Sequence, residues 1–437
     1  MYALEKITSF FSSRKRKTKS FPSLVAKKQR QSTESSAEFT KPPVSSFGIL
    51  QLPRETLWHI FEHMDLTSLI RFQQVSSQSK YDVIRFLKRT SQIPKFAKWF
   101  SEFRSNVETS KMCQFMMKAV FMDEFSIFHY QSALNWLKAA YPFRDVLPLP
   151  MMLETFMFGI STEYRILLIR GLTEAFFKED MSSYIKIRLE DSTRYTELES
   201  EMYLRFRETM YNVQMENNTK ALVFSTFLRY FASLWTARVE YICVMALFGP
   251  RKVSGEKMAI NFEEIEDGHL APTELRGISE FFRILPSLES TDVPRIIRWS
   301  KRACFALLED LTTSPMWSMQ NFVTLLILQP YLALITITVR VDSGMIAEAA
   351  SVFFYILRKC YFQWLYPSNN KIRFAEYILN HISADEAREF FIHFRQQSVD
   401  YLNEYRRIQR DEQVETIREA VVQAYFTVFG FDPEKDH

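Results

Sequence analysis

The chain has 437 residues, of which 47% are hydrophobic and 15% aromatic, so it can bury a large core and is not a wholly disordered protein. It contains only 9 glycines and no leucine-rich or Trp-Asp repeat, which argues against a leucine-rich solenoid or a β-propeller. The net charge of +4 is uneven, because residues 1–46 carry 10 Lys and Arg but 3 Asp and Glu. The remaining residues are slightly acidic, so we do not expect the folded body to bind nucleic acid.

Residues 1–46 form an arm rich in Ser, Lys, Arg and Pro, which cannot bury enough apolar surface to offset the entropy of ordering. We therefore expect a disordered arm. It contains two short basic clusters, a pattern that suits the acidic groove of a nuclear import receptor and predicts a nuclear protein. The residues of these clusters are Arg14, Lys15, Arg16, Lys17, Lys27, Lys28 and Arg30.

Two alternatives exist for the arm. The first is a basic tail that keeps the chain soluble and binds no import receptor. The second is a membrane-surface or organellar presequence, in which one apolar helical face precedes the basic run. The residues of such a face are Leu4, Ile7, Phe10 and Phe11.

Residues 47–90 form a compact unit of short helices. Leu52-Pro53 is an extended dipeptide that begins a helix, with the proline in its first turn. Apolar residues then recur at helical spacing on either side of Asp65, which is the N-cap candidate of the second helix. These apolar residues are Leu57, Ile60, Phe61 and Met64, then Leu69, Phe72 and Val75. Helices this short make a poor core alone, so their exposed apolar faces require a partner.

This pattern resembles the F-box family without a gap from Leu52 to Ser76. Two positions depart from the family pattern, since Ser68 stands where Asp is common and Ser79 where Trp is common. The resemblance implies a three-helix module that binds the Skp-family adaptor of a cullin-RING ubiquitin ligase. The adaptor-binding residues that it implies are Leu52, Pro53, Leu57, Ile60, Phe61, Met64, Leu69 and Val75.

Residues 91–437 predict one long helical domain, because apolar residues recur at three- and four-residue spacing. The clearest segments are 111–128, 131–141, 161–177, 221–248, 272–285, 293–311 and 345–366. Ser383 and Glu386 form a capping box, which predicts the start of a further helix. No fixed repeat period is evident, so we expect an irregular, HEAT-like stack. Charged residues crowd in 178–218, and a division of the domain would fall there.

Residues 311–339 contain no charged side chain, and this raises the question of a membrane span. Pro330 and neighbouring polar residues leave apolar pieces shorter than the ~20 residues that a helix needs to cross a bilayer. We predict two buried helices that meet at Pro330, because proline cannot continue a helix interior. The β-branched run 335–339 is the best strand candidate, but its neighbours favour a helix. No membrane association of the body is expected.

Two short motifs, Ala-Leu-Phe-Gly-Pro at 246–250 and Thr-Glu-Leu at 273–275, flank a loop with an acidic run at 263–267. We interpret the acidic run as a solvated loop between helices, or alternatively as a segment that binds a partner. The two motifs resemble the F-box only protein 47 group, which joins an F-box to a long helical region. That group is associated with meiotic prophase in germ cells, so the resemblance implies a role there.

We find no motif for catalysis, a cofactor or a metal. G-x-S-x-G, Walker and G-x-G-x-x-G sequences are missing. His59, Glu62 and His63 match the spacing of inverted zinc peptidases, but the F-box pattern explains the residues between them and no third ligand is evident. The four cysteines form no CxxC pair, so we predict reduced, buried thiols in a nucleocytoplasmic protein.

These patterns together predict a non-catalytic substrate receptor of a Skp-cullin-F-box ubiquitin ligase, located in the nucleus, with the cytoplasm as an alternative further location. Such a receptor raises the effective concentration of a substrate lysine beside the ubiquitin-conjugating enzyme by binding both sides at once. The F-box would bind the adaptor, and the helical domain would bind an unknown protein substrate. The alternative is a nuclear helical scaffold whose F-box mediates protein interaction without ubiquitin transfer, and cullin association separates the two.

Overall fold

The computed structural model describes residues 52–103, 128–158, 160–254, 257–288, 294–362, 368–404 and 408–435. Almost every regular element within these residues is a helix, which confirms the predicted all-α class. The chain divides into two compact units, Met1–Phe86 and Leu87–His437. The basic arm, with both predicted import clusters, lies outside the described residues, as does the predicted segment 111–128 except for its last residue.

The described part of the first unit consists of α2 (Arg54–His63), α3 (Leu66–Gln73) and most of α4 (Ser77–Leu87). Pro53 precedes α2 as its N-cap instead of lying in its first turn, and its carbonyl accepts the amide N–H of Leu57 at 3.0 Å. Asp65 caps α3 as predicted, because its Oδ1 accepts the amide N–H of Ser68 at 2.6 Å.

Aromatic packing holds the three helices of the first unit together. Phe61 on α2 lies edge to face against Phe72 on α3 and Phe86 on α4, with ring centroids 5.5 and 5.4 Å away. Leu57 and Leu69 are buried as well. Each helix therefore contributes to one small core, as an amphipathic helix does when its apolar stripe faces its neighbours.

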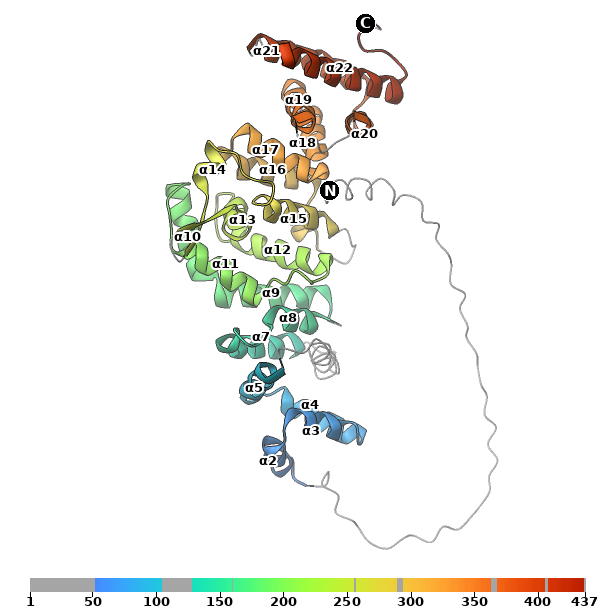
Figure 1. Cartoon of the computed structure of the whole chain (residues 1–437). Helices are drawn as coiled ribbons and strands as arrows, with labels where there is room; N and C mark the ends of the chain where they lie inside the picture. The colour runs from blue at the N-terminus through green and yellow to red at the C-terminus, as the bar shows by residue number, and fades with distance from the viewer. Residues whose placement is uncertain are drawn as a thin grey trace, which may run out of the picture. The chain divides into compact units, whose positions relative to one another are not determined.

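The second unit is a series of helices, two strands and short 3-10 turns (Figure 1). Its first described helices are α5 (Ile93–Phe103), α7 (Phe128–Ala140), α8 (Leu149–Met157), α9 (Thr162–Phe176), α10 (Lys178–Glu190), α11 (Leu198–Thr209), α12 (Asn217–Ala232) and α13 (Glu240–Phe248). After the strands β1 (Arg251–Ser254) and β2 (Lys257–Ile260) come α14 (Phe262–Glu266), α15 (Arg276–Ile284), α16 (Lys301–Thr313), α17 (Met319–Leu328), α18 (Pro330–Asp342), α19 (Ile346–Phe362), α20 (Ser368–Leu379), α21 (Ala384–Glu404) and α22 (Ile408–Phe429).

These helices stack in chain order. α7 packs on α9, α9 on α12 and α12 on α13, which in turn packs on α16. The series continues through α18, α19 and α21, and ends where α20 and α21 pack on α22. Contacts thus run mainly between neighbouring layers, as in helical repeat proteins, where each layer covers the apolar face of the next.

Phenylalanine fills much of the space between the layers. Phe224 on α12 lies 4.9 Å from Phe248 on α13 and 5.7 Å from Phe281 on α15, measured between ring centroids. Nearer the C-terminus, the ring of Phe353 on α19 lies 5.4 Å from that of Phe390 on α21. Large rings bury much area at little cost in side-chain entropy, which accounts for the 40 phenylalanines of the chain.

The segment 221–248, singled out for its helical apolar spacing, contains two helices. α12 ends at Ala232 and α13 begins at Glu240, and residues 233–239 between them are not helical. Most residues of both helices are buried, so the apolar pattern continues across the break and does not reveal it. An ion pair between Arg229 and Glu240, with Nη1 and Oε1 2.9 Å apart, joins the two helices across this break.

The acidic side chains of the run 263–267 are mainly exposed, as interpreted, but most of the run is helical and not a loop. β1 and β2 form an antiparallel hairpin in which Arg251 pairs with Ile260, and the acidic residues follow on α14. Asn321 on α17 fixes α14, because its Nδ2 donates to the carbonyls of Glu264 and Ile265 at 2.6 and 3.2 Å. A buried amide thus satisfies carbonyls at the helix end that have no partner within the helix.

Two predicted local signals are confirmed. The capping box closes, since the amide N–H of Ser383 donates to Glu386 Oε2 at 3.1 Å and that of Glu386 donates to Ser383 Oγ at 3.3 Å, directly before α21. Pro330 is the first residue of α18, so α17 and α18 meet there as predicted, and run 335–339 is helical. No single helix among the described residues is long and apolar enough to span a membrane, although α17 and α18 pass together as a pair bent by 116°.

Candidate functional sites

The predicted adaptor-binding residues of the first unit differ in burial. Leu57, Phe61 and Leu69 are buried, so these side chains present no surface to a partner while the unit keeps this fold. The remaining five residues are at least partly accessible: Leu52, Ile60 and Met64 are half-buried, and Pro53 and Val75 are exposed. Val75 is 69% exposed. Of the eight predicted residues, these five are the ones that a partner can contact in this fold.

Ser76 and Ser79 cap the start of α4 in a way that the sequence analysis missed. Ser79 Oγ accepts the amide N–H of Ser76 at 2.8 Å, and Ser76 Oγ accepts the amide N–H of Ser79 at 3.0 Å. Ser79 is fully buried, so the departure from the Trp of the F-box pattern is accommodated by a reciprocal cap. Two serines three residues apart ahead of an apolar run are a signal from which this cap could have been predicted.

The described residues contain no group of three or more His, Cys, Asp or Glu side chains that could hold a metal ion. His59 Nδ1 lies 3.5 Å from Glu62 Oε2 on the exposed face of α2. Burial raises the pKa of both Cys304 and Cys360 to about 12, and it raises the pKa of Cys243 as well. These thiols are protonated at neutral pH and therefore poorly nucleophilic.

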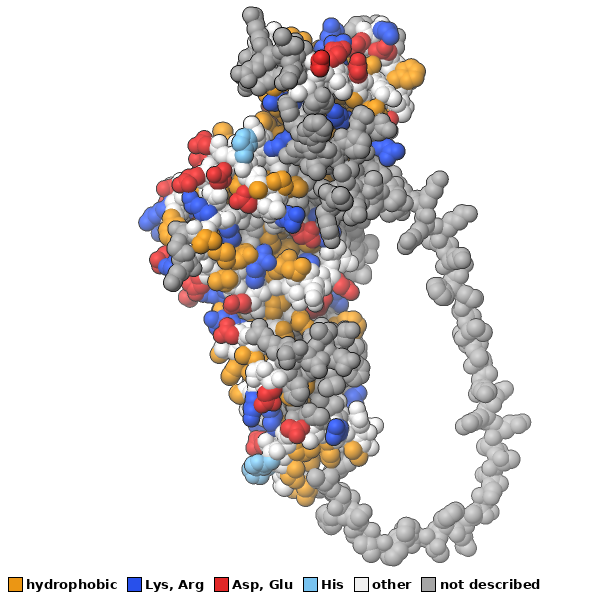
Figure 2. Space-filling view, in the orientation of Figure 1, with side chains coloured by type: hydrophobic (Ala, Val, Ile, Leu, Met, Phe, Trp, Pro, Cys, Tyr) orange, Lys and Arg blue, Asp and Glu red, His pale blue; other side chains and the backbone are white. Residues whose placement is uncertain are grey.

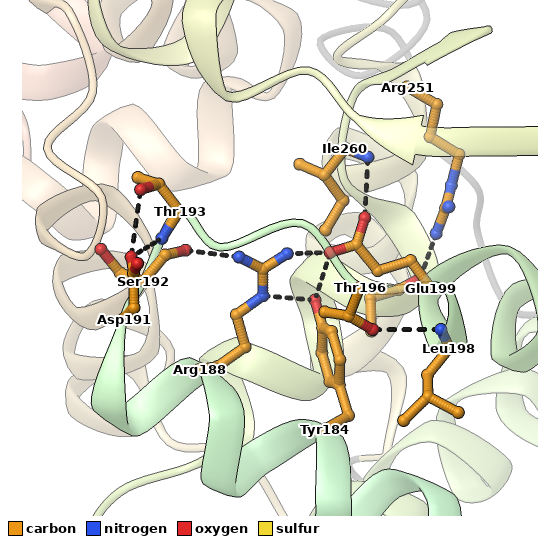
Figure 3. A network of polar contacts seen from close by, with 11 residues as sticks. Tyr184, Arg188, Asp191, Ser192, Thr193, Thr196, Leu198, Glu199, Arg251 and Ile260 are labelled. Atoms are coloured by element: carbon orange, nitrogen blue, oxygen red, sulfur yellow. Dashed lines mark hydrogen bonds and ion pairs between the residues drawn. The ribbon is translucent and has the colours of Figure 1, made fainter. Parts of the chain in front are cut away.

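The second unit contains a buried ion pair between Arg188 at the end of α10 and Glu199 in the first turn of α11 (Figure 3). The two side chains are 4% and 1% exposed. Arg188 Nε donates to the hydroxyl of Tyr184 at 2.9 Å, and its Nη1 donates to the carbonyl of Ser192 at 2.8 Å. Glu199 Oε2 accepts the amide N–H of Ile260 at 3.0 Å. Both charges are thus paired and further hydrogen-bonded, which a buried ion pair requires.

This network connects α10 and α11 to the hairpin, and its role is structural. Burial raises the pKa of Tyr184, and the positive charge of Arg188 opposes that shift. A neighbouring cavity, lined in part by Arg188, Tyr241 and Pro315, has a volume of about 10 Å³, which suffices for one water molecule. This cavity is too small for a substrate or cofactor.

The same network shows that the division considered within 178–218 does not occur. Both α10 and α11 belong to the second compact unit. The charged residues that weakened the apolar pattern there include Arg188 and Glu199, which are buried as partners of one another. No pattern in the sequence distinguishes these two residues from exposed charges, because their pairing depends on the packing of α10 against α11.

Comparison with models of known families identifies both units. An F-box domain model matches residues 49–81, which include α2, α3 and the start of α4. The protein is therefore an F-box protein, and F-box domains bind Skp1 and so cullin-RING ligases. A second model, described as FBXO47, ARM repeats, matches residues 177–424, more than half of the chain. The chain belongs to the FBXO47 family.

The family model also sharpens the predicted architecture. The irregular, HEAT-like stack expected from the sequence is described by the model as ARM repeats, a related class of stacked helices. The search of curated proteins found no match, and neither did the search of solved structures.

Proposed function

We propose that this protein is a substrate-receptor subunit of a Skp-cullin-F-box ubiquitin ligase. Its F-box would bind the Skp-family adaptor. The second unit, which contains the matched ARM repeats and is called the ARM-repeat unit below, would bind the substrate. One observation carries the proposal: the F-box helices leave the apolar side chains of Ile60, Met64 and Val75 partly or largely exposed in the segment that the F-box model matches. Such a surface favours burial against a partner.

The proposal assigns no bond chemistry to the chain. A receptor that binds the adaptor and the substrate at once converts ubiquitin transfer into an effectively intramolecular step. The stacked helices of the ARM-repeat unit are suited to bind the substrate, because repeat proteins of this kind offer long surfaces to partner chains. We further propose that the protein acts in the nucleus, through the basic clusters of the arm, and in meiotic prophase, as its family suggests.

Adaptor binding tests the proposal directly. In Ile60→Asp a charge replaces a half-buried apolar side chain of the F-box, and we expect adaptor affinity to fall by about 30-fold or more. Ile60→Leu is the matched control, because it keeps the volume and the apolar character of the side chain. Affinity would be measured by calorimetry with purified Skp1. Undiminished binding by Ile60→Asp would mean that this face of the F-box is not the adaptor surface.

Cullin association separates a ligase receptor from a scaffold. The purified protein with its adaptor should recruit a cullin, and the recruitment should disappear in Ile60→Asp. An adaptor complex that forms normally but recruits no cullin would favour the scaffold and refute the ligase role.

The nuclear location is tested by neutralising the arm. We expect replacement of both basic clusters by glutamine to move the protein from the nucleus to the cytoplasm, because import receptors bind such clusters through their charge. The replaced residues are Arg14, Lys15, Arg16, Lys17, Lys27, Lys28 and Arg30. A variant that stays nuclear in imaging would show that the arm is not the import signal.

A further inference from the structure

An arginine on α11 is held between two tyrosines. Tyr203, Arg207 and Tyr211 follow one another at four-residue spacing, and the Cζ of Arg207 lies 4.5 and 4.9 Å from the centroids of the two rings. A second guanidinium, that of Arg251 on β1, lies 4.0 Å from the centroid of Tyr203. Aromatic rings attract cations and hold a guanidinium in place, so Arg207 is positioned in advance.

Arg207 has no anionic partner. Among the described residues it forms no hydrogen bond or ion pair, its Nε is buried without a partner, and the side chain as a whole is half-buried, so its two terminal nitrogens are not fully enclosed. Neighbouring carboxylates pair elsewhere. Glu208 Oε2 lies 3.0 Å from Nε of Arg144, and Glu280 Oε2 accepts Nε–H of Arg283 at 2.6 Å.

Two further cations reinforce the positive charge. Arg251 donates to the carbonyl of Ala246, and its Nε and Nη1 are buried with no hydrogen-bond partner among the described residues. Burial lowers its pKa to about 10, so it remains charged at neutral pH. Lys220 at the start of α12 donates from Nζ to the carbonyl of Val213 at 2.6 Å, and this nitrogen lies 5.9 Å from the centroid of Tyr211.

Exposed apolar side chains flank the arginine. Leu204, three residues before Arg207 and therefore on the same side of α11, is 43% exposed, and Val213 is 69% exposed. On the face shown in Figure 2, hydrophobic and basic side chains lie side by side over α11 and α12. We name this cluster of Tyr203, Leu204, Arg207, Tyr211 and Val213 the α11 patch.

We propose that the α11 patch is the substrate-docking site, and that it binds an acidic peptide segment in which an Asp or Glu stands beside an apolar residue. The carboxylate would accept hydrogen bonds from the two terminal nitrogens of Arg207, the paired geometry that guanidinium groups favour. The apolar residue would cover Leu204 and Val213. This inference rests on the proposed function, since it specifies what the receptor binds.

A peptide selection tests it. Full-length protein bound to Skp1 would be used to select from a phage-displayed library of random dodecamer peptides, and the selected peptides would be synthesised with a fluorescent label. We expect them to carry Asp or Glu beside Leu, Ile, Val or Phe. Arg207→Gln should weaken their binding by about tenfold or more, and so should replacement of the acidic residue by its amide.

Arg194→Gln is the matched control, because Arg194 is an exposed arginine of the same unit, in the segment before α11. It should bind the selected peptides as the wild type does. Helix content from circular dichroism and Skp1 binding show that each variant is folded. Peptides without acidic residues, or equal binding by Arg207→Gln, would overturn the inference. A random single-stranded oligonucleotide that binds more tightly than the peptides, and through Arg207, would overturn it as well.

The two proposals fail in different ways. Loss of Skp1 binding by the wild-type protein would refute the ligase role whatever the peptides do. Normal Skp1 binding without peptide binding through Arg207 would refute only the α11 patch.

Discussion

The F-box unit is held by polar contacts between close neighbours in the chain, whereas the ARM-repeat unit adds buried polar contacts between distant segments to its local ones. In the F-box, Asp65 caps the amide of Ser68, three residues away. In the ARM-repeat unit, Glu199 accepts the amide of Ile260, and Asn321 Oδ1 accepts the amide of Leu270 at 2.7 Å, so the partners are 61 and 51 residues apart. A short motif can therefore specify the first unit, whereas the second depends on contacts between distant segments.

This difference has a functional counterpart. The surface of the F-box comes from one continuous stretch of sequence, and its partner can be predicted from the motif. The α11 patch draws instead on α11, the following loop and the charge of β1, with Arg251 44 residues after Arg207. Substrate recognition by such a unit can diverge while the stack of helices is kept, because surface positions change without affecting the buried layers.

The largest effect is expected from removal of a long-range contact in the ARM-repeat unit. Glu199→Ala leaves Arg188 buried without its charge partner and takes the acceptor from the amide of Ile260. We expect the free energy of unfolding of this unit to fall by about 3–5 kcal/mol. Urea unfolding of the full chain, followed by hydrogen exchange and mass spectrometry, would measure this loss. The stability of the F-box should be the same in Glu199→Ala as in the wild type.

A double variant provides the control for this prediction. Arg188→Met with Glu199→Leu removes both charges and relieves the unpaired buried guanidinium, so part of the stability should return, while the amide of Ile260 stays without its acceptor. If Glu199→Ala unfolded at the same urea concentration as the wild type, the pair would not be buried in solution.

The next largest effect is expected at Phe61, and it tests whether the buried F-box residues stabilise the F-box core. Phe61→Ala removes a ring that contacts Phe72 and Phe86, and we expect a loss of at least about 3 kcal/mol in the stability of the F-box. Because the unit is small, amide protection of α2, α3 and α4 should collapse while that of α12 to α19 persists. Protection that is retained in α2 would contradict the core position of Phe61.

Val75 lies in the same motif but, unlike Phe61, it is exposed. Its side chain is 69% exposed, so Val75→Asp should leave the amide protection of the F-box intact. We expect its affinity for Skp1 to fall by about tenfold, because a charge would enter an apolar interface. The comparison with Phe61→Ala separates contact residues from core residues. Wild-type affinity in Val75→Asp would place Val75 outside the interface.

The smallest effects concern helix caps, one in each unit. Asp65→Ala in the F-box and Ser383→Ala before α21 each remove an N-cap and should cost about 1 kcal/mol. Asp65→Asn and Ser383→Thr retain an acceptor and should lose much less. Hydrogen exchange within α3 and α21 measures both. Equal losses of local stability in α3 and α21 would show that the two units do not differ in the strength of their helix caps. A much larger loss at one of the two caps would show that they do.

The sequence alone determined the features that depend on neighbours in the chain. The F-box motif, the Asp65 cap, the capping box at Ser383 and the boundary at Pro330 all rest on signals within a few residues. Such signals need no knowledge of the rest of the fold, because capping and helix breaking act on the adjacent turn. The stacked helical class also followed, from apolar spacing over the long second unit.

Tertiary structure alone decided the features that depend on distant partners. The break after Ala232 and the pairing of Arg188 with Glu199 had no local signal. The same is true of exposure, since Leu69 and Val75 look alike in the motif but one is buried and the other accessible. Whether a charge is paired or a side chain covered depends on which segments pack together, and packing is a property of the whole chain.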